Sequence, residues 1–179
     1  MKSGFTLIIE HGQIGICLFV LEKMMKKMEE GEKIPFLHFN NIIIFLHEFA
    51  DHCHHLKEEI CFFPEVIKTK DKKLSILVTD LIDEHKKARE LITELKHEFG
   101  KYKNGEKDEE KMFRNIIFQY IILLKKHISK ENEILFPLSE KVLTEKTDKK
   151  IVDGFLKIDK KTNKNSIRII NDLKKKYFV

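Results

Sequence analysis

The sequence predicts an all-α protein, an up-down-up-down four-helix bundle with an appended C-terminal helix. Apolar residues recur every three or four positions along most of the chain, as on one face of a helix, and no stretch alternates like a strand. Four short charged or turn-forming stretches interrupt the pattern, and short connections favour antiparallel neighbours. With 179 residues, 42% of them apolar, the chain suits one domain.

The interruptions set the bounds of the expected helices. They fall at 29–35, 68–73, 101–110 and 144–150. The helices expected between them span 5–30, 36–68, 73–100, 109–142 and 150–177. Pro35 suits the first turn of the second helix, and Asn104-Gly105 suits the loop that ends the third. We therefore expect a bundle over residues 1–143 and, over 144–179, a helix that packs on the bundle or extends it.

Charge and composition exclude several classes of function. The net charge is +5, and residues 140–179 carry twelve Lys and Arg against six Asp and Glu. This mixture is typical of a solvated helix face, so nucleic-acid binding is not expected. The longest apolar run, 14–21, falls short of the ~20 residues of a membrane span, and three cysteines without CxxC spacing indicate neither a disulfide framework nor a thiolate zinc site. We expect a cytoplasmic protein without membrane contact.

Three of the expected helices place a histidine within an apolar stripe. His11 lies between Leu7 and Ile14 at helical spacing, and His85 and His127 hold similar positions in the third and fourth helices. A lone core histidine is usually satisfied by hydrogen bonds, so these residues become informative only if a further pattern joins them.

An internal repeat supplies that pattern. The second helix contains HHLKEEICFFP and the fourth contains HISKENEILFP, and the two align on their Phe-Pro ends. The matched positions are His54 with His127, Glu58 with Glu131, Phe63 with Phe136 and Pro64 with Pro137. The first and third helices each carry a Glu-His pair, Glu10-His11 and Glu84-His85. The chain therefore looks like a duplicated helical hairpin.

The spacing within the repeat suits metal ligation. Residues at i and i+4 share one helix face, so each HxxxE pair can present an imidazole and a carboxylate to the bundle interior. Two further helices would add one histidine each. One metal ion would leave donors unused, whereas two ions bridged by both carboxylates would use all six. Without such cations, burying the carboxylates would cost several kcal/mol each.

These residues resemble hemerythrin-like proteins, the family also described as the HHE cation-binding domain. The resemblance runs from about Glu10 to Leu138 and implies a four-helix bundle around a non-heme di-iron centre with an oxo or hydroxo bridge. The implied ligands are His11, His54, Glu58, His85, His127 and Glu131, with the two glutamates as bridges. Mixed imidazole and carboxylate ligation suits iron on chemical grounds, and manganese or zinc remains compatible with it.

The sequence departs from the oxygen-carrying hemerythrins. Their ligand set has five histidines and two carboxylates, and one of the carboxylates comes from an HxxxxD motif. In this sequence the last motif is HxxxE, and the repeat pairs only four histidines. Two imidazoles, two bridging carboxylates and one oxygen bridge would leave an open position on both octahedral ions. This weakens simple oxygen carriage and leaves room for peroxide, nitric oxide or redox chemistry.

Four further residues are candidates for an extra ligand or for a partner of the ligands. His47 and its repeat counterpart Tyr120 lie seven residues before the two HxxxE histidines, on the same face of an α-helix. His55 and Glu59 form a second HxxxE pair, rotated by about 100° from the first. Their counterparts in the fourth helix are an isoleucine and an asparagine, which argues against direct ligation. We expect His52 to face solvent or a neighbouring helix.

The function expected from these residues is binding of a small oxidant ligand, namely oxygen, nitric oxide or peroxide, at the metal centre. An enzymatic alternative is a peroxide- or nitric-oxide-processing oxidoreductase. A regulatory alternative is an iron or oxygen sensor whose basic C-terminal helix docks on a partner when metal is bound. The sequence does not choose between them.

Overall fold

The structure, a computed structural model, describes residues 1–105, 109–160 and 165–178, and the statements below concern these residues. They are almost entirely helical, with no strand in the described ranges, so the all-α prediction is confirmed. The predicted break at 101–110 falls partly outside the described residues.

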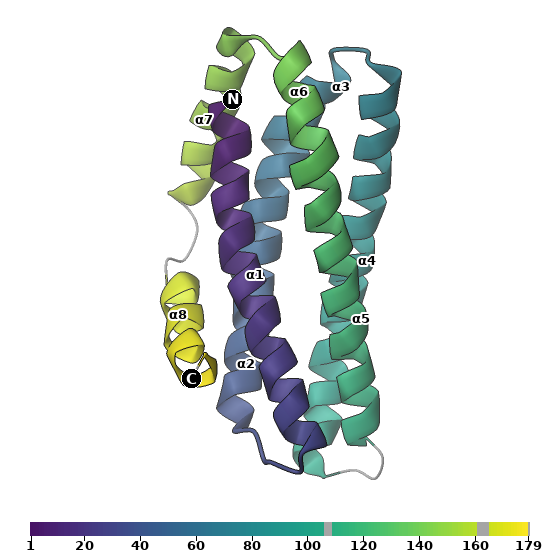
Figure 1. The fold of residues 1–179 in the computed structure, drawn as a ribbon, viewed down its shortest axis with the longest axis vertical. Coiled ribbons are helices and arrows are strands. Elements are labelled where there is room, and N and C mark those ends of the chain that lie inside the picture. Colours follow the sequence, from purple (N-terminus) through teal and green to yellow (C-terminus); the bar gives the residue numbers. More distant parts are fainter. Residues whose placement is uncertain (106–108, 161–164, 179) are drawn as a thin grey trace.

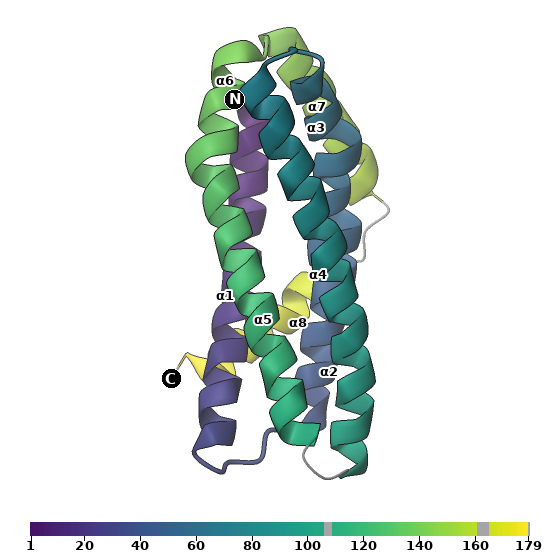
Figure 2. The same ribbon diagram turned by 90° about the vertical axis from the view of Figure 1, so that its right-hand side faces the viewer.

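Four long helical segments lie side by side (Figures 1 and 2), and each connection joins segments at the opposite end from the connection before it. The first is α1, Lys2–Glu29. The second runs through α2 (Phe36–Phe45), η1 (Leu46–His55), η2 (Glu58–Phe62) and α3 (Phe63–Ile67). The third is α4, Lys72–Asn104, and the fourth runs through α5 (Glu109–Lys130), η3 (Glu131–Leu135) and α6 (Phe136–Val142). These segments match the four predicted helices to within a few residues.

Local signals explain where α4 begins and ends. Asp71 precedes the helix, and its side chain accepts a hydrogen bond from the backbone N–H of Leu74 at 3.0 Å, as an N-cap does. Gly105 ends the helix in the left-handed conformation with φ of 72°, which glycine adopts without steric cost. As predicted for Asn104-Gly105, a glycine thus ends this helix.

Three stretches of the second and fourth segments are π-helical, which the sequence reasoning did not predict. In η2 and η3, the backbone N–H groups of Phe63 and Phe136 bond to the carbonyls of Glu58 and Glu131, five residues back. A proline follows each of these phenylalanines. Because proline has no N–H and its ring clashes with the carbonyl four residues earlier, a wider turn relieves the helix there. The duplicated Phe-Pro is therefore the signal of a duplicated π-turn.

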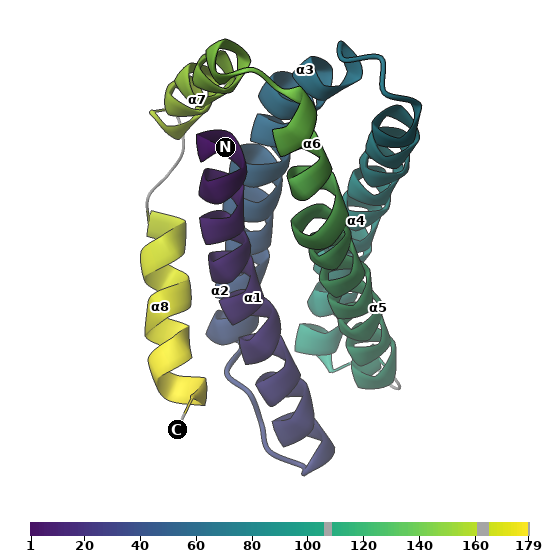
Figure 3. The same cartoon turned by 45° about the horizontal axis from the view of Figure 1, so that its top comes forward.

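The C-terminal part differs from the prediction. A single helix over 150–177 is wrong: the structure has two, α7 (Glu145–Asp159) and α8 (Asn165–Tyr177), while residues 161–164 lie outside the described ranges. α7 packs on α1 and η2, and α8 packs on α1 and α2 (Figure 3). The charged stretch 144–150, predicted as a break, contains the first turn of α7, and the Thr144 side chain caps this helix by accepting a hydrogen bond from the Thr147 N–H.

α7 also holds the start of α1. The Asp148 carboxylate accepts hydrogen bonds from the backbone N–H groups of Lys2 and Ser3, at 2.8 and 3.1 Å. These groups have no partner within the helix, and a negative charge at this end is favoured by the helix dipole. By length and composition, α1 could cross a membrane, although half of its most apolar 18-residue window is buried inside the structure, as in a core helix.

The apolar core consists of two clusters on either side of a polar layer. Leu7, Leu81 and Leu135 belong to one cluster, and Ile14 and Leu124 belong to the other. The polar layer lies between these positions on each helix, at the level of the predicted metal ligands. The fold therefore gathers the ionisable residues into one buried layer between two apolar ends.

Candidate metal centre

The structure brings the six predicted ligands together in the polar layer. They form two groups of four that share both glutamates, and the candidate ligand atoms of each group lie within 4.8 Å of one another. The groups are His11, His54, Glu58 and Glu131, and Glu58, His85, His127 and Glu131. None of the six residues is more than 4% exposed.

Each imidazole has its Nε2 atom near a carboxylate oxygen. The Nε2 atoms of His11 and His127 lie 3.1 and 3.3 Å from Glu131 Oε2. Those of His54 and His85 lie 3.5 and 3.4 Å from the Oε1 and Oε2 atoms of Glu58, respectively. Two donors each about 2.1 Å from one ion, at right angles, are about 3 Å apart. The spacing therefore suits donors that share an ion, and Glu58 turns one oxygen to each group.

Hydrogen bonds at Nδ1 hold the four imidazoles in this orientation. An N–H at Nδ1 that donates to an outer acceptor leaves the Nε2 lone pair for a metal ion. The bonds join His11 to Asn132 at 2.8 Å, His54 to Glu10 at 2.9 Å, His85 to Glu59 at 2.7 Å and His127 to Glu84 at 3.0 Å. All four Nε2 atoms consequently face the shared glutamates.

These outer contacts repeat between the two hairpins. Glu59 and Asn132 occupy equivalent repeat positions, and each bonds the histidine on the first helix of the other hairpin. The Glu of each Glu-His pair, predicted to lie outside the ligand set, bonds the HxxxE histidine of its own hairpin and also pairs with a lysine. Lys57 pairs with Glu10, and Lys130 pairs with Glu84. The duplication thus extends beyond the ligands to their supporting residues.

The electrostatics of the centre favour a cation. Burial and the neighbouring Glu131 raise the pKa of Glu58 well above its usual range. Burial also acts to raise the pKa of Glu131, but His127 and His11 hold it well below its usual range. Burial acts to lower the pKa of His127, which Glu131 and Glu84 nonetheless raise to about 9. A cation bound among these groups would displace their protons.

The acceptor atoms of the centre also lack donors. Both oxygens of Glu58 and of Glu131, and the Nε2 atoms of His11 and His54, are buried and find no hydrogen-bond partner within the described part of the chain. Buried polar atoms are normally satisfied, and leaving four carboxylate oxygens unpaired is costly. Two metal cations would satisfy these atoms, so the residues present fit the predicted kind of site.

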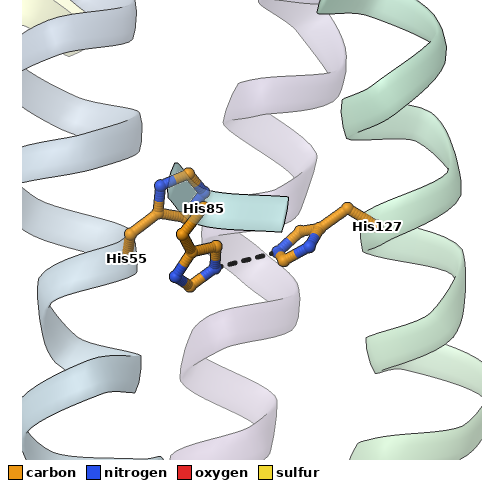
Figure 4. Close-up of side chains that lie close together, drawn as sticks. All are labelled: His55, His85 and His127. Carbon is orange, nitrogen blue, oxygen red and sulfur yellow. Dashed lines mark hydrogen bonds between the residues drawn. The ribbon is translucent and has the colours of Figure 1, made fainter. Parts of the chain in front are cut away.

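His55 lies closer to the centre than its sequence position suggested. It is 1% exposed, its ring stacks on that of His85 with centroids 3.9 Å apart, and it forms a third group of candidate ligands with His85 and His127 (Figure 4). Both its ring nitrogens are buried without a hydrogen bond in the described structure, while Asp51 Oδ1 lies 3.7 Å from Nδ1. His55 therefore has a free nitrogen in the region of the second group.

The other candidates separate clearly. Glu59 bonds His85 and accepts from Arg89, so it is placed as a partner of a predicted ligand. Tyr120 is fully buried in the larger apolar cluster, and its hydroxyl has no hydrogen-bond partner within the described residues. The expectation that His47 shares a face with His54 is wrong, because His47 is half-exposed and contacts Glu48. The π-helical η1 lies between them, and its wider turn changes which residues align.

Sequence reasoning missed Asn132 and the two lysines. Their signal was present in the repeat, since Lys57 and Lys130 occupy equivalent positions and Asn132 matches Glu59. Aromatic rings cover one side of the polar layer in the same duplicated way. Phe63 stacks on His85 and Phe136 on His11, both with centroids 5.7 Å apart. Such an apolar shell limits the access of water to the centre.

Comparison with known proteins agrees with the geometry. The family model described as the hemerythrin HHE cation binding domain matches residues 6–139, which include all six central residues. No curated protein and no solved structure matches the chain. Because the family match covers most of the chain and the His and Glu groups suit a metal site, the chain belongs to the hemerythrin HHE cation-binding family.

Proposed function

We propose that the chain binds two iron ions in the buried centre and there binds oxygen, nitric oxide or peroxide. The observation that carries this proposal is the pair of four-residue donor groups that share Glu58 and Glu131. When bound, iron would supply redox chemistry and coordination of a small ligand. Mixed imidazole and carboxylate donors suit iron, and manganese or zinc would compete for the same donors.

The position of His55 supports an unequal pair of ions. His55 forms a group with His85 and His127 that does not include the glutamates, so the His85 side has one more neighbouring imidazole than the side with His11 and His54. If a ring nitrogen of His55 turned to an ion on its side, that ion would have five protein donors and an ion on the His11 side would have four. The expectation of an open position on both ions is thereby replaced by a proposal of one, on the His11 side.

A pocket supports ligand access on that same side. It has a volume of about 340 Å³ and lies between the start of α1 and the η3–α6 region. Its lining includes Asn132, which bonds His11, and Phe136, which stacks on the His11 ring. A small diatomic ligand or peroxide could reach the outer face of His11 from this pocket. Gly4 and Ile8 line its wall on α1.

We further infer that residues 1–143 form an up-down-up-down four-helix bundle and that the chain works in the cytoplasm. The four segments that lie side by side in Figures 1 and 2, with connections at alternating ends, support the bundle. The two C-terminal helices would then be an addition packed along α1. This architecture is the usual frame for metal sites built from facing helices.

The test is the metal content of the purified protein with its ultraviolet-visible spectrum before and after exposure to oxygen, nitric oxide and peroxide. We expect two irons per chain and a charge-transfer spectrum that responds to at least one ligand. Glu58→Ala should lose iron, whereas His97→Ala, at an exposed site on α4, should not. Two irons and an unchanged spectrum in Glu58→Ala would refute the bridging role. Turnover of hydrogen peroxide would favour the oxidoreductase over the carrier.

A further inference from the structure

The π-helical segment η1 creates a second cluster of metal-ligand side chains on the surface. In an α-helix, residues five apart point about 140° away from each other. In a π-helix, with hydrogen bonds from i to i+5, they lie one turn apart on the same face. His47 and His52 are five apart within η1, and their ring centroids are 4.1 Å apart. The wide turn therefore brings two imidazoles together outside the buried centre.

A carboxylate completes this cluster. Glu48 Oε1 lies 2.9 Å from His47 Nδ1, and one ligand atom from each of His47, Glu48 and His52 lies within 4.8 Å of the others. The side chain of His47 is 35% exposed, that of Glu48 39% and that of His52 56%. They are thus open to solvent, unlike the six residues of the centre.

We propose that His47, Glu48 and His52 form a separate surface site for a divalent transition-metal cation. Two imidazoles and one carboxylate are the protein ligands of known open zinc sites, in which water takes the fourth position. The exposure of the cluster leaves room for that water. Because all three ligands come from one π-helical turn, the site requires no rearrangement of the neighbouring helices.

The surface site is separated from the centre by one ion-paired residue. Asp51 lies 3.8 Å from His52 and 3.7 Å from His55, and Arg89 donates to it at 2.7 Å. Burial acts to raise the pKa of Asp51, but His55 and Arg89 lower it to about 2. Asp51, whose carboxylate is held by Arg89, lies between the surface site and the buried centre. We therefore expect zinc bound at the surface site to leave the donors of the buried centre unchanged.

Zinc binding to the full chain, in its metal-loaded form, tests the site. Free zinc is titrated by equilibrium dialysis, with zinc and iron both measured by mass spectrometry. The wild type should bind one zinc ion per chain more than His52→Ala, while the iron content stays constant. Glu48→Gln keeps the shape of the side chain and should weaken zinc binding about tenfold or more. His97→Ala removes an exposed histidine outside the cluster and should bind zinc as the wild type does.

Two outcomes would overturn the proposal: equal zinc binding by His52→Ala and wild type, or an equal loss in His97→Ala. Both substitutions lie at exposed helix positions, and far-ultraviolet circular dichroism shows whether the helices are intact. If the protein proves to bind no iron, the difference in zinc between wild type and His52→Ala still decides the question. The surface site and the proposed function therefore fail separately.

Discussion

The two equivalent glutamates beside the centre, Glu10 and Glu84, provide a matched test of burial. Each bonds an HxxxE histidine and pairs with a lysine from the other helix of its hairpin. The lysines differ: Lys57 is 1% exposed and Lys130 is 38% exposed. Glutamine in place of either glutamate keeps an acceptor for the imidazole but removes the charge opposite the lysine.

The magnitudes follow from that difference. Removing one partner of a buried pair costs about 3–5 kcal/mol, and we expect the lower end for Glu10→Gln because Asp159 still pairs with Lys57. For Glu84→Gln, solvent screening of Lys130 limits the loss to about 1 kcal/mol or less. At about 2–4 °C per kcal/mol for a chain of this size, Glu10→Gln should lower Tm by about 6–12 °C.

Thermal unfolding of the chelator-treated protein, followed by circular dichroism, measures both losses. Equal decreases in Tm for the two variants would refute the burial argument, since the repeat makes them otherwise alike. Metal affinity should respond differently from stability. Both variants lose a charged partner of a predicted ligand histidine, so both should bind metal about 10–100-fold more weakly.

Three other predictions concern the ligand side, the pocket and pH. His55→Ile installs the residue found at the repeat counterpart and should weaken binding of one of the two metal ions by at least about 10–100-fold, measured by competition with a chelator; unchanged affinity of both ions would exclude His55 as a donor. Ile8→Trp should fill the pocket and slow ligand association in stopped-flow absorbance without changing metal content; an unchanged rate would place the access route elsewhere. Partial burial acts to raise the pKa of Asp148, but hydrogen bonds from Ser3 and Lys2 lower it. The ionised Asp148 therefore stabilises the folded state fully above the unfolded pKa of about 3.9, and this stabilisation is lost as the pH falls through the lower folded pKa. In urea unfolding between pH 6 and pH 2, the free energy of unfolding should fall less with decreasing pH in Asp148→Asn than in the wild type. Equal dependence on pH in the two proteins would contradict the capping role of Asp148.

Much of the fold could be predicted because its signals are local. Apolar periodicity and the breaks at Pro35, Asp71 and Gly105 define the four long segments. A helix that faces a core needs an apolar face, and residues of these types mark where helices begin and end. The C-terminal part was less predictable. Its apolar pattern continues across 150–177, and the pattern alone does not tell one helix from two that lie against different parts of α1.

The candidate site divides in the same way. The repeat in the sequence was sufficient to group the six central residues, because i and i+4 spacing fixes their face. It misplaced His47, which lies in η1, where the turn is wider than an α-turn, and it left the role of His55 open. Partners such as Asn132 depend on how neighbouring helices pack, which helical periodicity does not report. The Phe-Pro sequence, present twice, was the available indication that the helices depart from α-geometry.

The division of donors between the hairpins determines what a bound metal pair would do mechanically. Within each four-residue group, both imidazoles come from one hairpin, and the only donor from the other hairpin is a glutamate. Glu58 and Glu131 would therefore act as cross-links between the two halves of the chain. Loss of metal would release these links, while the hydrogen bonds of His11 and His85 and those of Arg89 to Asp51 and Glu59 would still join the hairpins. Hydrogen exchange should then increase first where the hairpins meet, while each hairpin keeps its own helices.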